Sequence, residues 1–177
     1  MRIIGGSLRG RQIQVPRNFK GRPTTDFARE GLFNVLRTCD MPEGCEVLEL
    51  FAGTGVFSLE CLSRGALHTV SVEIAVPHVK AIRQNADSFG FRQAEVIKAD
   101  VIKWLPQCGR SFDLVFADPP FDLAQLPMLP SLVHKAGVVK ENGMFVLEHP
   151  DTVNFENEPD FLRMKNYGNV YFSFFRN

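Results

Sequence analysis

The segment Asp118-Pro119-Pro120-Phe121 carries the most specific chemistry in this sequence, and it follows directly on the apolar run 114–117. Its two prolines fix φ and remove two N–H donors, so few local donors compete for its carbonyl oxygens. A carboxylate and a fixed carbonyl that accept the N–H bonds of a base amine would make the nitrogen more nucleophilic, and Phe121 could stack on an extruded base. The segment therefore indicates chemistry on an exocyclic base amine, although it leaves open whether Asp118 also takes the proton.

Residues 49–55 read Glu-Leu-Phe-Ala-Gly-Thr-Gly, a turn that lets the backbone approach a ligand closely. Dinucleotide-binding turns require a third glycine where Ser58 stands here, so that fingerprint is incomplete. S-adenosylmethionine has an amino-acid end and a sulfonium, and the acid Glu49 suits that cation. The turn alone does not distinguish a cofactor site from a plain glycine turn.

Two further acids follow at the ends of expected strands. Glu73 lies eighteen residues after Gly55, where a carboxylate can accept bonds from both ribose hydroxyls of NAD or S-adenosylmethionine. Asp100 could bind the adenine amine, and a helix cap is an equally good interpretation of it. The expected cofactor-binding residues are Glu49, Phe51, Ala52, Gly53, Thr54, Gly55, Glu73, Ile74, Asp100 and Val101.

Alternating strand and helix patterns must position these residues. Strands are expected at 47–51, 69–73, 95–98, 112–117 and 143–148, and helices at about 26–38, 56–64, 77–89 and within 123–135. A hairpin is expected at 162–175 and another at 1–15. This order predicts a doubly wound, mostly parallel seven-stranded Rossmann-like sheet with helices on both faces, a C-terminal antiparallel hairpin and a small N-terminal β-hairpin arm. Ligands of such sheets bind beyond the carboxyl ends of the strands, where the acids named above collect.

Charge is distributed unevenly along a chain whose net charge is zero. Residues 1–37 hold eight basic and two acidic residues, a net charge of +6, whereas the remaining residues hold twelve basic and eighteen acidic, a net charge of −6. A basic arm on an acidic body suggests contact with a polyanion, although a solvated basic surface is about equally consistent with charge alone.

The four cysteines form no C-x-x-C pair, the N-terminus has no apolar signal region, and no apolar run is long enough to span a bilayer. We therefore expect reduced thiols, no metal and a cytoplasmic protein.

Several blocks resemble the bacterial RsmD family of class I methyltransferases. These blocks are the opening MRIIGGSLRGR, then Arg22-Pro23-Thr24-Thr25-Asp26 followed by Arg29-Glu30 and Leu32-Phe33-Asn34, then the Asp-Pro-Pro-Phe segment, and finally Tyr167-Gly168 with the phenylalanines after it. The resemblance spans essentially the whole chain. The departures from the family pattern are mild, namely Ala28 and Gly31 for larger residues, Glu49 for Asp and Thr54 for Ser.

The resemblance implies S-adenosylmethionine-dependent transfer of a methyl group to the 2-amino group of a guanine in 16S ribosomal RNA, on the small subunit or a late assembly intermediate. It makes Asp118 to Phe121 the target-base pocket. It divides the chain into a basic arm, 1–22, and a methyltransferase domain, 23–177, which we expect to act as a monomer. The expected RNA-contacting residues are Arg9, Arg11, Arg22, Thr24, Thr25 and Arg29, where Arg22 could instead hold the cofactor carboxylate or pair with Asp26.

Three other functions are compatible with part of the sequence. A DNA adenine-amine methyltransferase uses similar motifs, but such enzymes generally carry a separate recognition domain. This chain has at most a short arm to spare, which favours a substrate that supplies its own shape, as folded RNA does. An inactive RNA-binding module is disfavoured by the intact Asp118. A nicotinamide-dependent dehydrogenase is disfavoured by Ser58 and by the absence of a recognisable hydride-transfer motif. Guanine is preferred over adenine on the resemblance alone.

Overall fold

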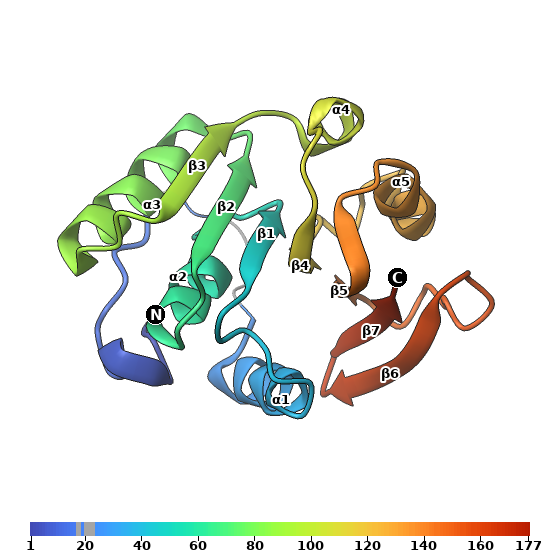
Figure 1. The fold of residues 1–177 in the computed structure, drawn as a ribbon, viewed down its shortest axis with the longest axis horizontal. Coiled ribbons are helices and arrows are strands. Elements are labelled where there is room, and N and C mark those ends of the chain that lie inside the picture. Colours follow the sequence, from blue (N-terminus) through green and yellow to red (C-terminus); the bar gives the residue numbers. More distant parts are fainter. Residues whose placement is uncertain (17–18, 20–23) are drawn as a thin grey trace.

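The fold is built on one seven-stranded sheet in the order β3-β2-β1-β4-β5-β7-β6 (Figure 1). The computed structural model describes residues 1–16, 19 and 24–177. All pairings are parallel except those of β7 with β5 and β6. The strands are β1 (Glu46–Leu50), β2 (His68–Glu73), β3 (Ala94–Lys98), β4 (Phe112–Ala117), β5 (Val139–His149), β6 (Phe161–Tyr167) and β7 (Val170–Arg176). The expected sheet is therefore confirmed, with its C-terminal antiparallel hairpin.

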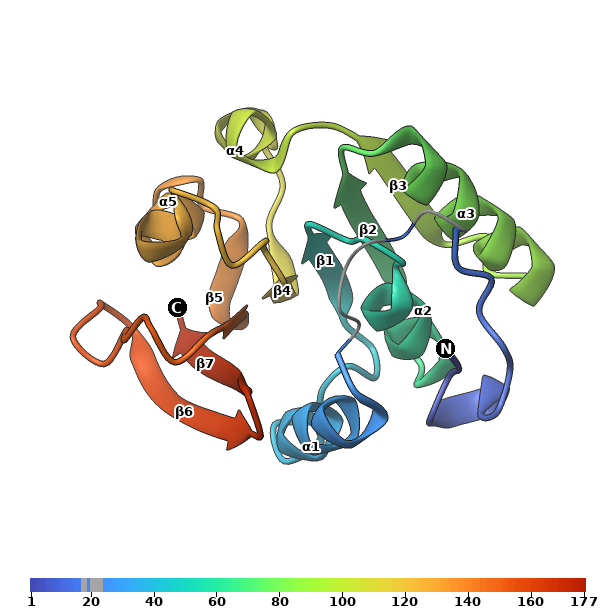
Figure 2. The same cartoon turned by 180° about the vertical axis from the view of Figure 1, so that it is seen from behind.

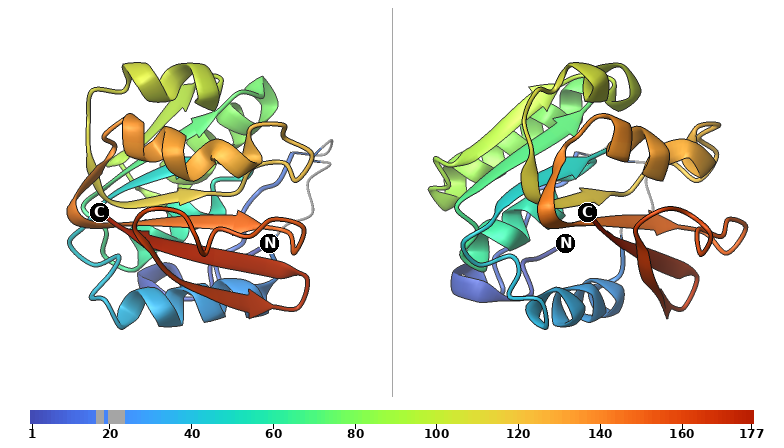
Figure 3. Two further views of the ribbon diagram at one scale, coloured as in Figure 1. Left: turned by 90° about the vertical axis from the view of Figure 1, so that its right-hand side faces the viewer. Right: turned by 45° about the vertical axis from the view of Figure 1, so that its right-hand side comes forward.

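Helices cover both faces of the sheet, as Figure 3 shows. Side chains alternate along each strand, so on β4 Phe116 packs with α1 and α2, whereas Val115 packs with α4 and α5. The helix α3 lies beside α2, since Leu59 and Ala86 belong to one core cluster. Ile82 and Val79 of α3 pack with Ala52 after β1 and with Val96 of β3. The helices are α1 (Asp26–Arg37), α2 (Val56–Ser63), α3 (Val76–Phe89), α4 (Val101–Trp104) and α5 (Leu129–Lys135).

The helix ends follow from local chemistry. Thr25 caps α1, because its hydroxyl accepts a hydrogen bond from the Ala28 N–H at 3.2 Å. Gly55 precedes α2 with φ of 69°, and Gly90 ends α3 with φ of 73°. Both values are left-handed, a conformation that is unfavourable for residues other than glycine. The cap and glycine residues that predict these helix ends in the sequence therefore lie at the helix ends in the structure.

The N-terminal segment packs on α2 and α3 rather than standing apart from the domain (Figure 2). Ile3 and Ile13 are buried against Leu59 and Ala86. The expected hairpin has only one bridge, Arg2 to Gln12, around a 3₁₀ turn at Gly6–Leu8. Backbone groups that would extend the strands bond instead to side chains of the two helices: Ile4 N–H to Glu60 at 2.8 Å, and Gln14 N–H to Asn85 at 2.9 Å.

Two other expectations need correction. The short helix α4 was not expected, and it begins where Asp100 accepts hydrogen bonds from the N–H groups of Ile102 and Lys103. Strand β5 begins at Val139 rather than at Gly143. Gly143 lies inside the strand, where the backbone packs closely: a Cβ at this position would come within 2.8 Å of the Lys140 carbonyl oxygen. The glycine therefore marks close backbone packing and not a strand end.

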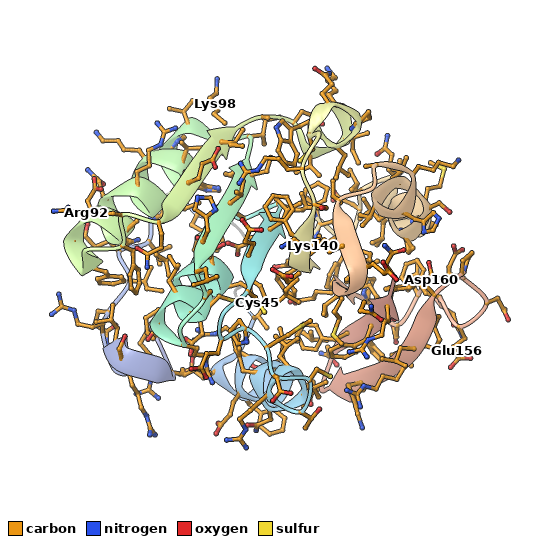
Figure 4. All side chains as sticks on the ribbon, viewed as in Figure 1. Cys45, Arg92, Lys98, Lys140, Glu156 and Asp160 are labelled. Atoms are coloured by element: carbon orange, nitrogen blue, oxygen red, sulfur yellow. The ribbon has the colours of Figure 1, made fainter. Side chains whose placement is uncertain are left out.

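The amino ends of the central strands are held by an ion-pair cluster. The Lys140 ammonium, labelled in Figure 4, lies 2.7 Å from Glu46 and 3.0 Å from Asp113. These partners lie within the first two residues of β1 and β4, so the cluster stabilises the sheet at the end opposite Glu49, Glu73, Asp100 and Asp118. No helix in the described ranges is long and apolar enough to cross a membrane.

Candidate active site

A cleft of about 1250 Å³ lies at the carboxyl ends of the parallel strands. It extends from the turn after β1, past the ends of β2 and β3, to the ends of β4 and β5. The expected cofactor-binding residues other than Gly55 line it, together with Asp118, Pro119, Pro120, Phe121, Thr24, Thr25 and Arg29. One cavity thus brings together residues that the sequence spreads over positions 24 to 121.

The turn after β1 has an unusual backbone. Phe51, Gly53 and Gly55 all have positive φ, of 56°, 53° and 69°. A non-glycine residue such as Phe51 adopts this conformation at a cost, and such residues gather at ligand sites. A Cβ at Gly55 would also come within 2.8 Å of the Ile82 side chain. The turn is therefore shaped to expose backbone groups to the cleft, with α3 packed closely behind it.

The Glu73 carboxylate bridges the end of β2 and the glycine turn. One oxygen accepts the Gly53 N–H at 2.7 Å and the other accepts the Ala75 N–H at 2.8 Å, while His78 Nδ1 lies 3.5 Å away. These bonds fix the carboxylate at the edge of the cleft, where each oxygen has a second lone pair for a ligand hydroxyl. The Phe19 ring packs 5.2 Å from the His78 ring and closes this side. Sequence reasoning did not find Phe19 or His78, because neither belongs to a motif.

Glu49 lies deeper, where its side chain is buried. One carboxylate oxygen accepts the Ser58 N–H at 3.2 Å and the Ser71 hydroxyl at 3.3 Å. Burial raises the pKa of Glu49 to about 7 in spite of these bonds. The carboxyl group is therefore prepared for a nearby cation, which would favour its ionised form.

Asp100 is the helix cap that the sequence offered as one interpretation, and it also lines the cleft. Its Oδ1 caps α4, at 2.9 Å from the Ile102 N–H. Val101 is buried beside it, whereas Ile74, after Glu73, is 61% exposed at the cleft. Thr54 is buried, with its hydroxyl 3.3 Å from the Met1 sulfur. The adenine-binding role of Asp100 stays a prediction.

The Asp118-Pro119-Pro120-Phe121 segment forms the far wall of the cleft. Asp118 follows β4 and is half-buried, and burial raises the pKa of its carboxyl to about 7. The Pro120 carbonyl accepts the Leu123 N–H at 2.9 Å, so the Pro119 carbonyl is the better candidate acceptor for a base amine. Phe121 is 47% exposed, as a ring that stacks on a base requires.

A residue that sequence reasoning missed, Glu148, lies beside Asp118. The register pairs Ala117 of β4 with Leu147 of β5, so the next residues on the two strands are neighbours. Glu148 is buried and accepts the Thr24 hydroxyl at 2.8 Å. Burial, and then the charge of Asp118, raise the pKa of Glu148 well above its usual range. The signal was present in the sequence, since Glu148 ends the expected fifth strand as the other acids end theirs.

The expected RNA-contacting residues have different surroundings. Arg9 and Arg11 are exposed on the N-terminal segment, and Arg22 lies outside the described residues. Thr24 donates its hydroxyl hydrogen bond to Glu148, and Thr25 caps α1. Arg29 is held inside the fold.

Arg29 is buried, with its guanidinium 2.6 Å from Asp26, 3.0 Å from the Arg2 carbonyl oxygen and 3.7 Å from Glu60. These contacts brace the N-terminal segment against α1 and α2. The expected RNA contact is therefore replaced by a structural one in this conformation.

An aromatic pair lies at the rim of the cleft beside this brace. The rings of Phe27 and Tyr167 meet edge to face, with 5.8 Å between centroids, and Phe27 is 69% exposed. Tyr167 packs on α1 at Gly31, where a Cβ would come within 2.1 Å of the Tyr167 ring. Gly31, where the family pattern has a larger residue, therefore makes room for this ring.

These residues fit S-adenosylmethionine as a ligand. A fixed carboxylate at the end of β2 suits ribose hydroxyls, a buried acid after β1 suits a cationic group, and Asp100 lies near the end of β3. The three positions lie in one cleft with the base-directed segment at its other end. Among the described residues, no group of three His, Cys, Asp or Glu side chains is arranged to hold a metal ion.

Comparisons with known proteins agree on one family. The family model described as Conserved hypothetical protein 95 matches residues 1–176. Ribosomal RNA small subunit methyltransferase D of Escherichia coli K12 is 34% identical over 148 residues, which cover 84% of this chain and 74% of that protein. The putative rRNA methyltransferase YlbH of Bacillus subtilis is 31% identical over 163 residues, covering 86% and 88%. The solved structure of the putative methyltransferase yhhF from Escherichia coli superposes with a TM-score of 0.88 at 30% identity, covering 100% of this chain and 97% of that one.

Proposed function

Because the chain belongs to the RsmD family, described as Conserved hypothetical protein 95, we propose that it transfers a methyl group from S-adenosylmethionine to a base of small-subunit ribosomal RNA. More finely, we propose the exocyclic 2-amino group of a guanine in 16S ribosomal RNA as the acceptor. The observation that carries the proposal is the single cleft that places the glycine turn and Glu73 opposite Asp118 and Phe121.

The cofactor end of the cleft is assigned to the turn after β1 and the acids that follow. Glu73 would hold the ribose hydroxyls, and Asp100 the adenine. The buried Glu49 would face the cationic part, whose charge favours the ionised carboxylate. When bound, S-adenosylmethionine supplies an electrophilic methyl group, and the electrons of its carbon–sulfur bond leave with the sulfur.

The other end of the cleft would hold the amine. Asp118 and the Pro119 carbonyl accept its two N–H bonds, and Phe121 stacks on the base, so the nitrogen lone pair is aimed along the cleft. A nitrogen held in this way would be aligned with the methyl group that S-adenosylmethionine supplies. The amine must lose one proton when the new C–N bond forms, and the neighbouring carboxylate of Asp118 would take it. Alignment and electrostatics carry most of the catalysis.

RNA contact is assigned to the N-terminal segment. We propose that residues 1–22 act as a basic arm, with Arg9 and Arg11 exposed, and that residues 23–177 form the methyltransferase domain. Because folded RNA supplies its own shape, a short arm suffices for recognition. We further propose that the protein acts as a monomer in the cytoplasm, where ribosomal subunits are assembled.

The proposal is tested by two measurements on the intact protein. S-adenosylhomocysteine should raise the melting temperature and NAD should not, because a ligand that binds only the folded state stabilises it. Labelled methyl groups should enter small subunits that lack the modification. Asp118→Ala should lower that rate by at least about a hundredfold. Asp122→Ala, at an exposed acid four residues later in the chain, serves as the matched control and should methylate the subunits at the wild-type rate. Stabilisation by NAD alone would overturn the cofactor assignment.

A further inference from the structure

Two carboxyl groups, and not one, face the base end of the cleft. Along β4 the core residue Phe116 is followed two positions later by Asp118, and along β5 Val146 is followed two positions later by Glu148. Since side chains alternate along a strand, both acids lie on the face that Phe116 and Val146 share. The pairing of Ala117 with Leu147 then makes them neighbours across the sheet.

Placing two acids together is costly, and the structure supports the arrangement through a third residue. Glu148 is only 3% exposed and Asp118 is half-buried, and two neighbouring carboxylates that are partly shielded from water repel each other. Thr24, far away in the sequence, donates a hydrogen bond of 2.8 Å to Glu148 and fixes its position. A buried acid held in this way at a cleft wall suits a ligand that brings several N–H donors.

The Watson–Crick edges of the two purines differ in this respect. Guanine presents an N1–H and two N–H bonds of its 2-amino group side by side, whereas adenine presents its amino group beside an N1 lone pair. Glu148, Asp118 and the Pro119 carbonyl together offer acceptors for all three guanine donors, and these donors favour the ionised forms of the two acids. An adenine in the same pose would point the N1 lone pair at a carboxylate, which repels it.

We propose that Glu148 reads the guanine edge by accepting the N1–H, while Asp118 and the Pro119 carbonyl accept the two N–H bonds of the reacting 2-amino group. This rests on the proposed function, because it names the residue that selects the base in the same pocket. In this proposal the hydrogen bond from Thr24 orients the Glu148 carboxylate toward the base. The Asp-Pro-Pro-Phe segment alone offers no such selection.

The exchange Glu148→Gln tests this directly, because glutamine keeps the shape but presents one acceptor and one donor. The glutamine N–H can donate to the N1 lone pair of adenine, whereas its neutral amide oxygen accepts the guanine N1–H more weakly than a carboxylate does. The protein is given two substrates: small subunits that lack the modification, and the same subunits with the target guanine replaced by adenine. Rates are expressed per S-adenosylhomocysteine-binding site, so that loss of folded protein does not count as loss of activity.

We expect Glu148→Gln to lower kcat/KM on the guanine subunits by about ten- to hundredfold and to raise the adenine-to-guanine ratio of rates. Glu141→Gln, at an exposed glutamate on the same strand, is the matched control and should behave as the wild type. A second variant, Thr24→Val, removes only the orienting hydrogen bond and should weaken guanine methylation less.

An unchanged guanine rate per binding site and an unchanged ratio in Glu148→Gln would overturn the inference while leaving the proposed function intact. Equal methylation of guanine and adenine subunits by the wild type would also overturn it. The proposed function fails differently, since the wild type itself would then transfer no methyl group to either kind of subunit.

Discussion

The pH dependence of stability in Glu49→Gln follows directly from the buried position of this acid. Burial raises the pKa of Glu49 to about 7, against an ordinary value of 4.5. Between these pH values the folded chain holds a proton at Glu49 that the unfolded chain has released. The free energy of unfolding of the wild type therefore falls as the pH rises through this window. Glutamine has no such proton, so the variant lacks this part of the pH dependence.

The size of the effect follows from the two pKa values. Between pH 5 and pH 9 the Glu49 contribution should cost the wild type about 2.5 kcal/mol of unfolding free energy that the variant keeps. The stability of Glu49→Gln relative to the wild type should thus rise by about that amount across the range. Most of the rise should lie below pH 7, and it should level off above it.

Urea denaturation at steps of pH, without cofactor, measures this difference. The other titrating groups act in both proteins, so their contributions largely cancel. Glu141→Gln serves as the control at an exposed glutamate and should show no pH-dependent difference. A flat difference between Glu49→Gln and the wild type from pH 5 to pH 9 would refute the reasoning, because the buried carboxyl would then ionise as freely as an unfolded one.

Three further predictions concern the turn, the helix glycine and the arm. Gly55→Ala should lower the unfolding free energy by about 1–2 kcal/mol and weaken S-adenosylhomocysteine binding, since the left-handed φ of 69° disfavours a side chain; unchanged denaturation and binding curves would contradict this. Gly31→Ala should fail to give the gain of about 1 kcal/mol that helix propensity alone predicts, because Tyr167 occupies the space of the new Cβ; a full gain in urea denaturation would show that the ring moves freely. Exchanging Arg9 and Arg11 for Gln should reduce the slope of log affinity for RNA against log salt by about two, and an unchanged slope would remove them from the RNA contact.

The strands and longer helices could be predicted from the sequence because their signals are local. Apolar runs bounded by glycine and an acid give β1, β2 and β4 almost to the residue. The errors have local causes as well. Gly143 suggested a strand start, although it lies within β5 where the Lys140 carbonyl approaches closely. The helix α4 is too short for a periodic pattern, so only its cap, Asp100, was visible.

The site residues also divide into those with a local sequence signal and those that only tertiary packing brings together. The glycine turn, Glu73 and the Asp-Pro-Pro-Phe segment were visible because their residue types and spacing carry the chemistry. The hydrogen bond between Thr24 and Glu148 joins positions 124 residues apart, so no local sequence pattern predicts it. The burial of Arg29 among Asp26, Glu60 and the Arg2 carbonyl depends equally on tertiary packing.

Mass spectrometry of nucleosides from small subunits that lack the modification, after reaction with the wild type and S-adenosylmethionine, tests the central claim most directly. The account predicts guanosine methylated on the 2-amino group, formed by the wild type and lost with Asp118→Ala. Subunits that remain unmethylated, with methyladenine instead formed in DNA, would contradict it and would favour a DNA adenine-amine methyltransferase.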